Sequence, residues 1–328
     1  MQKINIGFCK KDNLKEVINF VKTLKTEDNV INLPASIKYW QWKYARGLKQ
    51  KNPQWISLLR ADQKIAGIAG YQPTQLCTPW GKIKAAWGMD LFIDPDFRKQ
   101  SFLYAYQSRW ATSTLKKRGV QFLLTFLRTK ELVRAWQQSG FFISIYSFKL
   151  RIKKSQNYSL ANNKMIQSIK FFDKTINTFF KRVQFQYDFI LYRDQQYLNW
   201  RYFKHPSNKY KAFVLKNGKE ISGYIVVRAD KKNSQGYILD ILVDIEGDKD
   251  VFILLFKALH YLQKQNIREV NCLLSNKIYM KIFKKMGFMP QKKEHCGFLI
   301  KSKQLEHVCS KKTNWHITMG DGDFQGGH

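Results

Sequence analysis

The sequence predicts an α/β protein built from two successive units, each a mixed, mostly antiparallel sheet flanked by helices. Three motifs recur in the same order along the chain, and the predicted helices and strands recur in the same order around them. The recurring motifs are Trp42-Lys43-Tyr44 with Trp200-Arg201-Tyr202, Lys64 to Ala69 with Glu220 to Ile225, and Ser139-Gly140-Phe141 with Met286-Gly287-Phe288. One duplicated unit of roughly 150 residues accounts for all three.

The length of 328 residues fits two domains that each bury a core of their own. The predicted division is a first unit over 1–150, a basic amphipathic helical segment over 151–183, a second unit over 184–302 and a C-terminal tail over 303–328.

Hydrophobic spacing predicts the elements of the first unit. The predicted helices are 11–25, an aromatic helix from 40–44, 101–117 and 131–138, and the predicted strands are 55–60, 65–71, 83–93, 120–127 and 141–150. Pro95 ends the third strand because it has no N–H for a ladder hydrogen bond. Gly119 is a typical helix C-terminal cap.

The second unit repeats this order. The predicted helices are 197–203, 251–264 and 278–285, and the predicted strands are 211–215, 221–227, 236–243, 269–274 and 297–301. Between the units, apolar residues from Met165 to Val183 form a stripe at helical spacing in a strongly basic segment. We expect this helix to pack against its own unit, and peripheral contact with an anionic membrane is the alternative.

The net charge of +33 attracts polyanions such as nucleic acid, anionic lipid or phosphorylated small molecules. A generally Lys-rich composition is the other explanation of this charge. The five cysteines include no C-x-x-C pair, so neither a disulfide framework nor a metal site is expected. Without a secretory signal or an apolar run of about 20 residues, the expected location is the cytoplasm.

A ligand site is predicted where the third strand of the first unit runs into a helix. From Ile93 to Leu103 a turn precedes the helix, and Arg98 and Lys99 add positive charge. The N-terminus of a helix presents backbone N–H groups to an anion. The segment resembles motif A of the GNAT acyltransferases, hydrophobic-x-Pro-x-x-Arg-x-x-Gly-x-Gly, which binds the pyrophosphate of acetyl-CoA. Ile93, Pro95 and Arg98 match this motif.

The resemblance, which covers about residues 1–150, implies that acetyl-CoA or another acyl-CoA is a substrate. The implied acyl-CoA-binding residues are Phe92, Ile93, Arg98, Lys99, Gln100, Ser101, Phe102 and Leu103. Ser101 and Leu103 replace the two family glycines, and we expect Leu103 to crowd the entry. Gly140-Phe141 resembles the end of the family's motif B.

The second unit resembles the family at Asn276 and at Gly287-Phe288. Its loop over 244–250 holds four acids and one base, which would repel a pyrophosphate. The first unit alone is therefore expected to bind CoA.

In GNAT enzymes one group takes the proton of the acceptor amine and another protonates the leaving thiolate. The tyrosine that many members use as the acid is replaced here by Trp136 and Phe283. Asp90 is the candidate base, and Tyr104 is the candidate acid with Tyr106 as its alternative. Structural roles in the strand and in aromatic packing are the competing interpretations.

The tail from Trp315 to Phe324 resembles the ending of two-unit acetyltransferase-like proteins of bacterial polysaccharide loci, which is a strand and a loop. A frayed Gly-rich terminus is the alternative. The resemblance implies an acyl-CoA-dependent N-acyltransferase acting on a small amine, such as an amino sugar for a cell-surface polymer. The other hypotheses are a Fem-type aminoacyltransferase that uses aminoacyl-tRNA and a non-catalytic GNAT-like binding protein.

Overall fold

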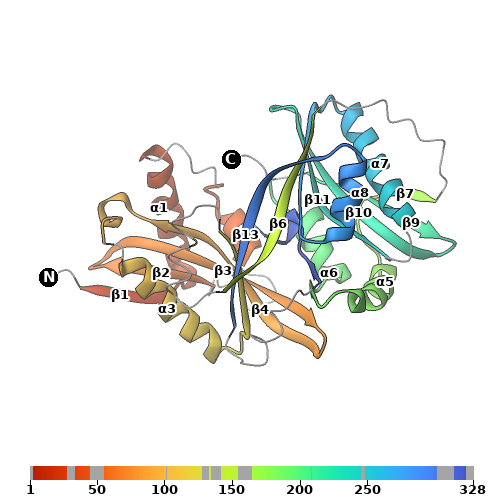
Figure 1. Cartoon of the computed structure of the whole chain (residues 1–328). Helices are drawn as coiled ribbons and strands as arrows, with labels where there is room; N and C mark the ends of the chain where they lie inside the picture. The colour runs from red at the N-terminus through yellow and green to blue at the C-terminus, as the bar shows by residue number, and fades with distance from the viewer. Residues whose placement is uncertain are drawn as a thin grey trace.

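The computed structural model describes residues 3–27, 34–44, 55–100, 102–127, 133, 142–153, 165–207, 209–244, 248–300 and 314–322. These residues form two α/β lobes that lie side by side (Figure 1). Each lobe has a mixed sheet flanked by helices, so the predicted fold class is confirmed.

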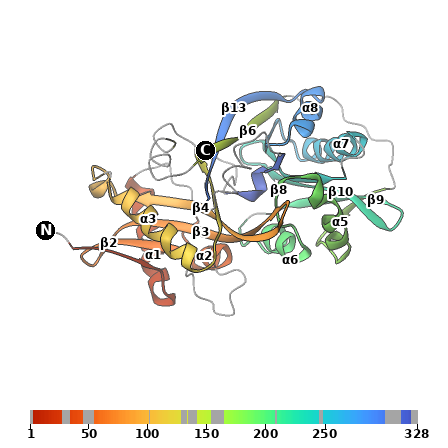
Figure 2. The same cartoon turned by 60° about the horizontal axis from the view of Figure 1, so that its bottom comes forward.

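The first lobe contains most of the elements that hydrophobic spacing predicted. They are β1 (Ile4–Phe8), α1 (Leu14–Glu27), α2 (Ile37–Tyr44), β2 (Ile56–Ala61), β3 (Lys64–Thr78), β4 (Gly81–Ile93), η2 (Pro95–Phe97), α3 (Phe102–Lys117) and β5 (Phe122–Leu127). The edge strand β1, antiparallel to β2, was not predicted. The helix expected over 131–138 lies outside the described residues except for Val133. Helices α1 and α2 pack on one face of the sheet and α3 packs on the other (Figure 2).

The remaining elements begin with the last strand of the first unit and then repeat the order of that unit, with a few additions. They are β6 (Phe142–Lys153), β7 (Ile166–Ile169), α5 (Thr175–Val183), β8 (Phe189–Leu191), α6 (Gln195–Leu198), η4 (Asn199–Phe203), β9 (Lys211–Asn217), β10 (Glu220–Asp230), β11 (Gln235–Val243), α7 (Asp248–Lys264), β12 (Glu269–Leu274), α8 (Lys277–Lys285), β13 (Met289–Ile300), β14 (Trp315–His316) and η5 (Met319–Asp321). Asn276 begins α8 because its side chain accepts hydrogen bonds from the N–H groups of Ile278 and Tyr279.

The spacing of the apolar residues over 165–183 predicted one continuous helix, but the structure does not contain one there. The first part of this range is β7, which pairs with β9 at the sheet edge, and only α5 is helical. Pairing with an available strand edge overrides a local helical pattern. The apolar residues of α5, including Ile176 and Phe180, are buried in the core.

The closing strands of the two units are exchanged, which the linear order of elements did not indicate. The last strand of the second unit, β13, pairs with β5 of the first unit. The last strand of the first unit, β6, pairs with β12 of the second, and β6 and β13 also pair with each other. The result is a continuous sheet of order β1-β2-β3-β4-β5-β13-β6-β12-β11-β10-β9-β7. One buried apolar cluster likewise contains residues of both units, including Trp87 and Tyr224.

The repeated Trp-x-Tyr motifs meet face to face. The rings of Trp42 and Trp200 stack with centroids 5.0 Å apart and planes inclined by 21°. The indole N–H of Trp42 donates to the backbone carbonyl of Trp200, and that of Trp200 donates to the carbonyl of Trp42, each at 3.0 Å. Reciprocal contacts of this kind define a two-fold axis. The duplicated units are therefore related here by a local two-fold.

Candidate functional site

Both units contain a pair of parallel strands that separates after four residues. In the first unit β4 pairs with β5 only from Ala85 to Gly88, opposite Phe122 to Thr125, although β4 continues to Ile93. In the second unit β11 pairs with β12 only as far as Ile238. We call the places where these pairs part the first and second strand openings.

Each opening has an irregularity in the longer strand. In β4 two residues, Asp90 and Leu91, oppose one residue of β3, and Asp90 has a positive φ of 50°. In β11 the extra residue is Leu239, next to Asp240. A bulge twists a strand away from its neighbour and turns a side chain to a new direction. The run from Asp90 to Asp94 recurs from Asp240 to Asp244 at an offset of 150 residues, a repeat that our sequence reasoning missed.

Asp90 is held by the repeated motif of its own unit. The Tyr44 hydroxyl donates to its carboxylate at 2.5 Å, and the Lys43 ammonium lies 2.7 Å from the same oxygen. The Lys43 and Asp90 side chains are 1% exposed. Tyr44 also approaches Gly70 so closely that a Cβ there would lie 1.8 Å from its hydroxyl. The candidate base is therefore part of a buried ion pair that fixes α2 to the sheet.

The loop after β4 presents its basic residues to solvent. Asp94 caps η2 by accepting from the N–H of Asp96, and Arg98 donates from Nε to the carbonyl of Ile93 at 3.1 Å. Arg98, Lys99 and Gln100 are exposed. Lys64 lies 3.3 Å from Asp94 and 3.5 Å from Asp96, so these two acids have a cation of their own. Ser101 lies outside the described residues.

The other acyl-CoA-binding candidates differ in burial. Leu103 is fully buried in a cluster with Phe97 and residues of β2 and β3, so its side chain is turned into the core. Phe92 and Ile93 pack against clusters on opposite faces of the sheet. Phe102 is 62% exposed at the start of α3.

Tyr104 packs with Ala111, Leu115 and Tyr71 between α3 and the sheet. Burial, followed by the neighbouring Tyr71, raises the pKa of the Tyr104 phenol. A raised pKa makes the phenol a weaker acid, which counts against its predicted role as a proton donor.

The second opening is filled by the chain itself. Residues Asn314 to Gly322, which we call the C-terminal segment, begin with β14, which pairs with β8. The N–H of Ser275, just beyond β12, donates to the carbonyl of Ile317 at 3.1 Å, and Leu274 forms an isolated bridge with Thr318. The described part of the predicted tail is thus a short strand, as expected, but the 3-10 helix η5 follows it where a loop was predicted.

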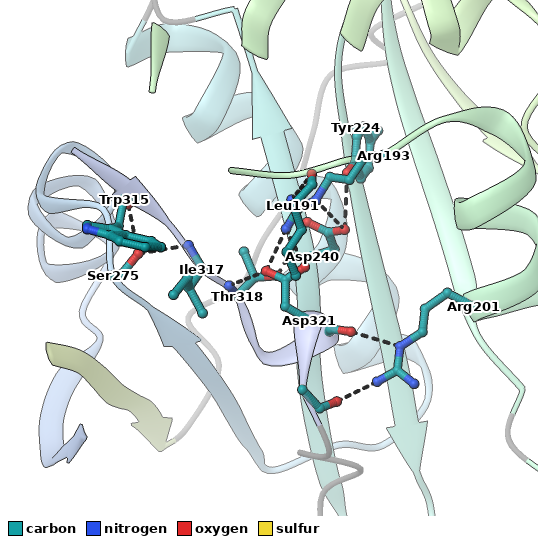
Figure 3. Close-up of polar contacts among 12 residues, drawn as sticks. Leu191, Arg193, Arg201, Tyr224, Asp240, Ser275, Trp315, Ile317, Thr318 and Asp321 are labelled. Atoms are coloured by element: carbon teal, nitrogen blue, oxygen red, sulfur yellow. Dashed lines mark hydrogen bonds and ion pairs between the residues drawn. The ribbon is translucent and has the colours of Figure 1, made fainter. Parts of the chain in front are cut away.

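A buried network of charges anchors this segment (Figure 3). The Arg193 guanidinium donates to Asp240 at 3.2 Å and to both carboxylate oxygens of Asp321 at 2.6 Å, and all three side chains are at most 1% exposed. The Tyr202 and Tyr224 hydroxyls both donate to Asp240 at 3.1 Å. Burial raises the pKa of Asp321 to about 6 against the opposing effect of Arg193. Asp240 thus accepts a hydrogen bond from Tyr202, as Asp90 does from Tyr44. Asp240 lies beside the second strand opening, which the C-terminal segment fills.

The C-terminal segment continues from the second unit to the first. Arg201 donates from Nε to the carbonyl of Gly320 at 2.8 Å and from a terminal nitrogen to that of Gly322 at 2.6 Å. Its guanidinium lies 5.8 Å from the ring centroid of Trp42. Gly322 in turn contacts Phe126 of β5, which is the first residue beyond the part of that strand that pairs with β4. Neither Arg193 nor this path was apparent from local sequence patterns.

These features define a class of fold: two GNAT-like units in tandem, each with its diverging parallel strands. Solved structures share it. A GCN5-related N-acetyltransferase from Anabaena variabilis matches with a TM-score of 0.64 and 12% identity over 91% of this chain and 73% of its own. A tandem GNAT protein of the clavulanic acid biosynthesis pathway matches with a TM-score of 0.60 and 10% identity over 91% of this chain and 98% of its own.

The Saccharomyces cerevisiae N-myristoyltransferase with bound myristoyl-CoA also matches, with a TM-score of 0.64 and 12% identity over 91% of this chain and 82% of its own. No protein-family model and no curated protein matches the sequence. The expected tandem GNAT fold is therefore confirmed by structural likeness. Among the described residues, no helix combines the length and apolar character needed to cross a membrane.

Proposed function

We propose that the protein is an acyl-CoA-dependent N-acyltransferase whose single acyl-CoA site is the first strand opening. The observation that carries this proposal is the difference between the two openings. The C-terminal segment fills the second, between β11 and β12. The first is followed by a loop with exposed Arg98 and Lys99. Among solved structures of the same fold, one is a GCN5-related N-acetyltransferase. Another is an N-myristoyltransferase, which was solved with bound myristoyl-CoA.

The loop residues bind the diphosphate of the acyl donor in this proposal. Arg98, Lys99, Gln100 and Ser101 precede α3, where the helix dipole favours an anion. Phe102 and Tyr106 are 62% and 51% exposed and, one turn apart, share a face of α3. Exposed aromatic rings beside basic groups suit stacking with a base, so they contact the adenine. The buried side chain of Leu103 and the partly buried side chains of Phe92 and Ile93 support the loop from below.

In the reaction the acceptor amine attacks the thioester carbonyl, a C–N bond forms, the C–S bond breaks, and the amine proton is lost while the thiolate is protonated. Asp90 as base and Tyr104 as acid stay predictions. The ion pair of Asp90 with Lys43 favours a role in fixing α2 beside the opening. The proposed acceptor is a small amine such as an amino sugar, which rests on the resemblance of the tail.

Calorimetry with acetyl-CoA tests the donor site. We expect one binding event per chain, and Arg98→Ala should raise Kd at least about tenfold because a charge-assisted hydrogen bond is worth about 1.5–3 kcal/mol. Phe102→Ser should raise Kd about fivefold or more through lost stacking. Arg268→Ala and Phe171→Ser are the controls. They remove an exposed arginine and a phenylalanine that is 63% exposed, both outside the first unit, and both should leave Kd unchanged.

The same measurement separates the alternatives. Absence of acetyl-CoA binding together with tight tRNA binding that weakens steeply with salt would favour the aminoacyl-tRNA hypothesis. Absence of both would favour a non-catalytic binding protein. Equal losses in the control variants would show that Arg98 acts only through general charge.

A further inference from the structure

Two glycines in the C-terminal segment allow close approaches that no larger residue permits. A Cβ on Gly320 would lie 2.1 Å from the Tyr202 hydroxyl and 2.8 Å from the backbone carbonyl of Leu239. A Cβ on Gly322 would lie 2.2 Å from Cε2 of Phe126. Gly322 has a φ of −113°, which other residues adopt freely. Glycine is therefore required at 322 by its contact with Phe126 and not by its backbone conformation.

Phe126 cannot move away easily when this contact is crowded. Its ring stacks on Trp87 of β4, with centroids 4.8 Å apart and planes inclined by 26°. Trp87 is 1% exposed and belongs to the core cluster shared by both units. The Thr125 hydroxyl, one residue earlier, donates to the carbonyl of Gly88, the last residue of β4 that pairs with β5. Phe126 thus stands on the wall of the first opening, supported from behind.

From this geometry we propose that the C-terminal segment serves both openings. It fills the second opening as an intramolecular occupant, and its Gly322 end completes the wall of the first. Arg193 and Arg201 hold it in both roles, because Arg193 binds Asp321 and Arg201 binds the carbonyls of Gly320 and Gly322. The effect on acyl-CoA binding rests on the proposed function above, whereas the packing of Gly322 on Phe126 does not.

A double-mutant cycle tests this wall. We compare the wild type with Gly322→Ala, Phe126→Ala and the double variant, and measure both acetyl-CoA affinity by calorimetry and Tm. Gly322→Ala should raise Kd at least fivefold and lower Tm by crowding Phe126. In the Phe126→Ala background the same change should have little further effect on either quantity, because the crowding atoms are gone.

A matched glycine controls for the added methyl group. A Cβ on Gly7 would meet no atom within 4 Å, so Gly7→Ala should keep the wild-type Kd and Tm. The proposal is overturned if Gly322→Ala behaves like Gly7→Ala, if the two changes add independently, or if two acetyl-CoA molecules bind per chain. Absence of acetyl-CoA binding in the wild type would defeat the proposed function, while the Tm cycle would still report on the Gly322 contact.

Discussion

Lys43 and Arg201 occupy the same position of the repeated Trp-x-Tyr motif, yet they bind different partners. Lys43 neutralises Asp90 in its own unit, whereas Arg201 binds two carbonyls of the C-terminal segment. The counterpart of Asp90, Asp240, takes Arg193 as its cation instead. The substitution of Arg for Lys suits this change, because a guanidinium has several donors in a fixed plane.

Removal of Arg193 should be costly at neutral pH. In Arg193→Met, Asp240 and Asp321 lose their shared buried cation, and we expect the free energy of unfolding to fall by about 3–5 kcal/mol. Arg182→Met is the control, since Arg182 forms exposed pairs with Glu220 and Asp244 that contribute about 0–1 kcal/mol. Urea unfolding at pH 7.5 measures both. Similar losses in the two variants would contradict a special role for the buried network.

The loss of unfolding free energy in Arg193→Met should be smaller at pH 5 than at pH 7.5. Burial raises the pKa of Asp321 in the folded protein to about 6, above the ordinary value of 3.8 for an aspartate. A carboxyl group whose pKa is raised on folding favours the folded state when it is protonated, so its contribution to stability falls as pH rises from about 4 to 6. Without Arg193 this effect is stronger, because the opposing cation is gone.

At the scale of elements, the contact between α2 and η4 joins the two copies of one motif. The stacked indoles of Trp42 and Trp200 exchange hydrogen bonds with each other's backbone. A motif that packs against its own copy explains why both Trp residues persist in the two units. The same elements place Lys43 and Arg201 on either side of the local two-fold.

The two tryptophans should therefore act as one unit in stability. Trp42→Ala and Trp200→Ala should each cost about 3 kcal/mol, and the double variant should cost at least about 1 kcal/mol less than their sum, because each single change already breaks the stack. Trp80→Ala, at the exposed β3–β4 turn, should add independently to either one. Urea unfolding of the set measures the coupling energy. If the losses of unfolding free energy for Trp42→Ala and Trp200→Ala simply added in the double variant, the predicted coupling would be contradicted.

At the scale of the whole molecule, strand exchange makes each unit depend on the other. β13 covers the edge of β5, and β6 covers the edge of β12. An uncovered β5 or β12 would leave a row of backbone donors and acceptors without partners. The apolar cluster that contains Trp87 and Tyr224 also spans both units.

We therefore expect the chain to unfold in a single transition. Seven of its nine tryptophans precede residue 150, so tryptophan fluorescence reports mainly on the first unit, whereas far-UV circular dichroism reports on both. The two signals should give the same urea midpoint. Separate midpoints would show that the units are independent in spite of the exchanged strands.

Local patterns predicted the identity and order of most elements correctly. Hydrophobic periodicity indicated α1, α3, α7 and the hairpin strands, and the motif at Ile93, Pro95 and Arg98 indicated the fold. They failed where pairing partners are distant in sequence, as at β7 and in the exchanged strands. The repeat of Asp90 at Asp240 was available in the sequence, and an alignment of the two units by offset would have found it.

Local sequence patterns were enough to predict an α/β protein of two similar units, because spacing and turn chemistry are local properties. The difference between the loops over 93–103 and 244–250 is likewise visible in the sequence, and the binding of a phosphate by the first loop stays a prediction. Tertiary structure alone decided which strand closes which unit and what occupies the second opening. Arg193 and Asp321 are 128 residues apart, and Phe126 and Gly322 are nearly 200 apart. Buried charges and close glycine contacts of this kind depend on desolvation and shape in the folded molecule, which no local pattern encodes.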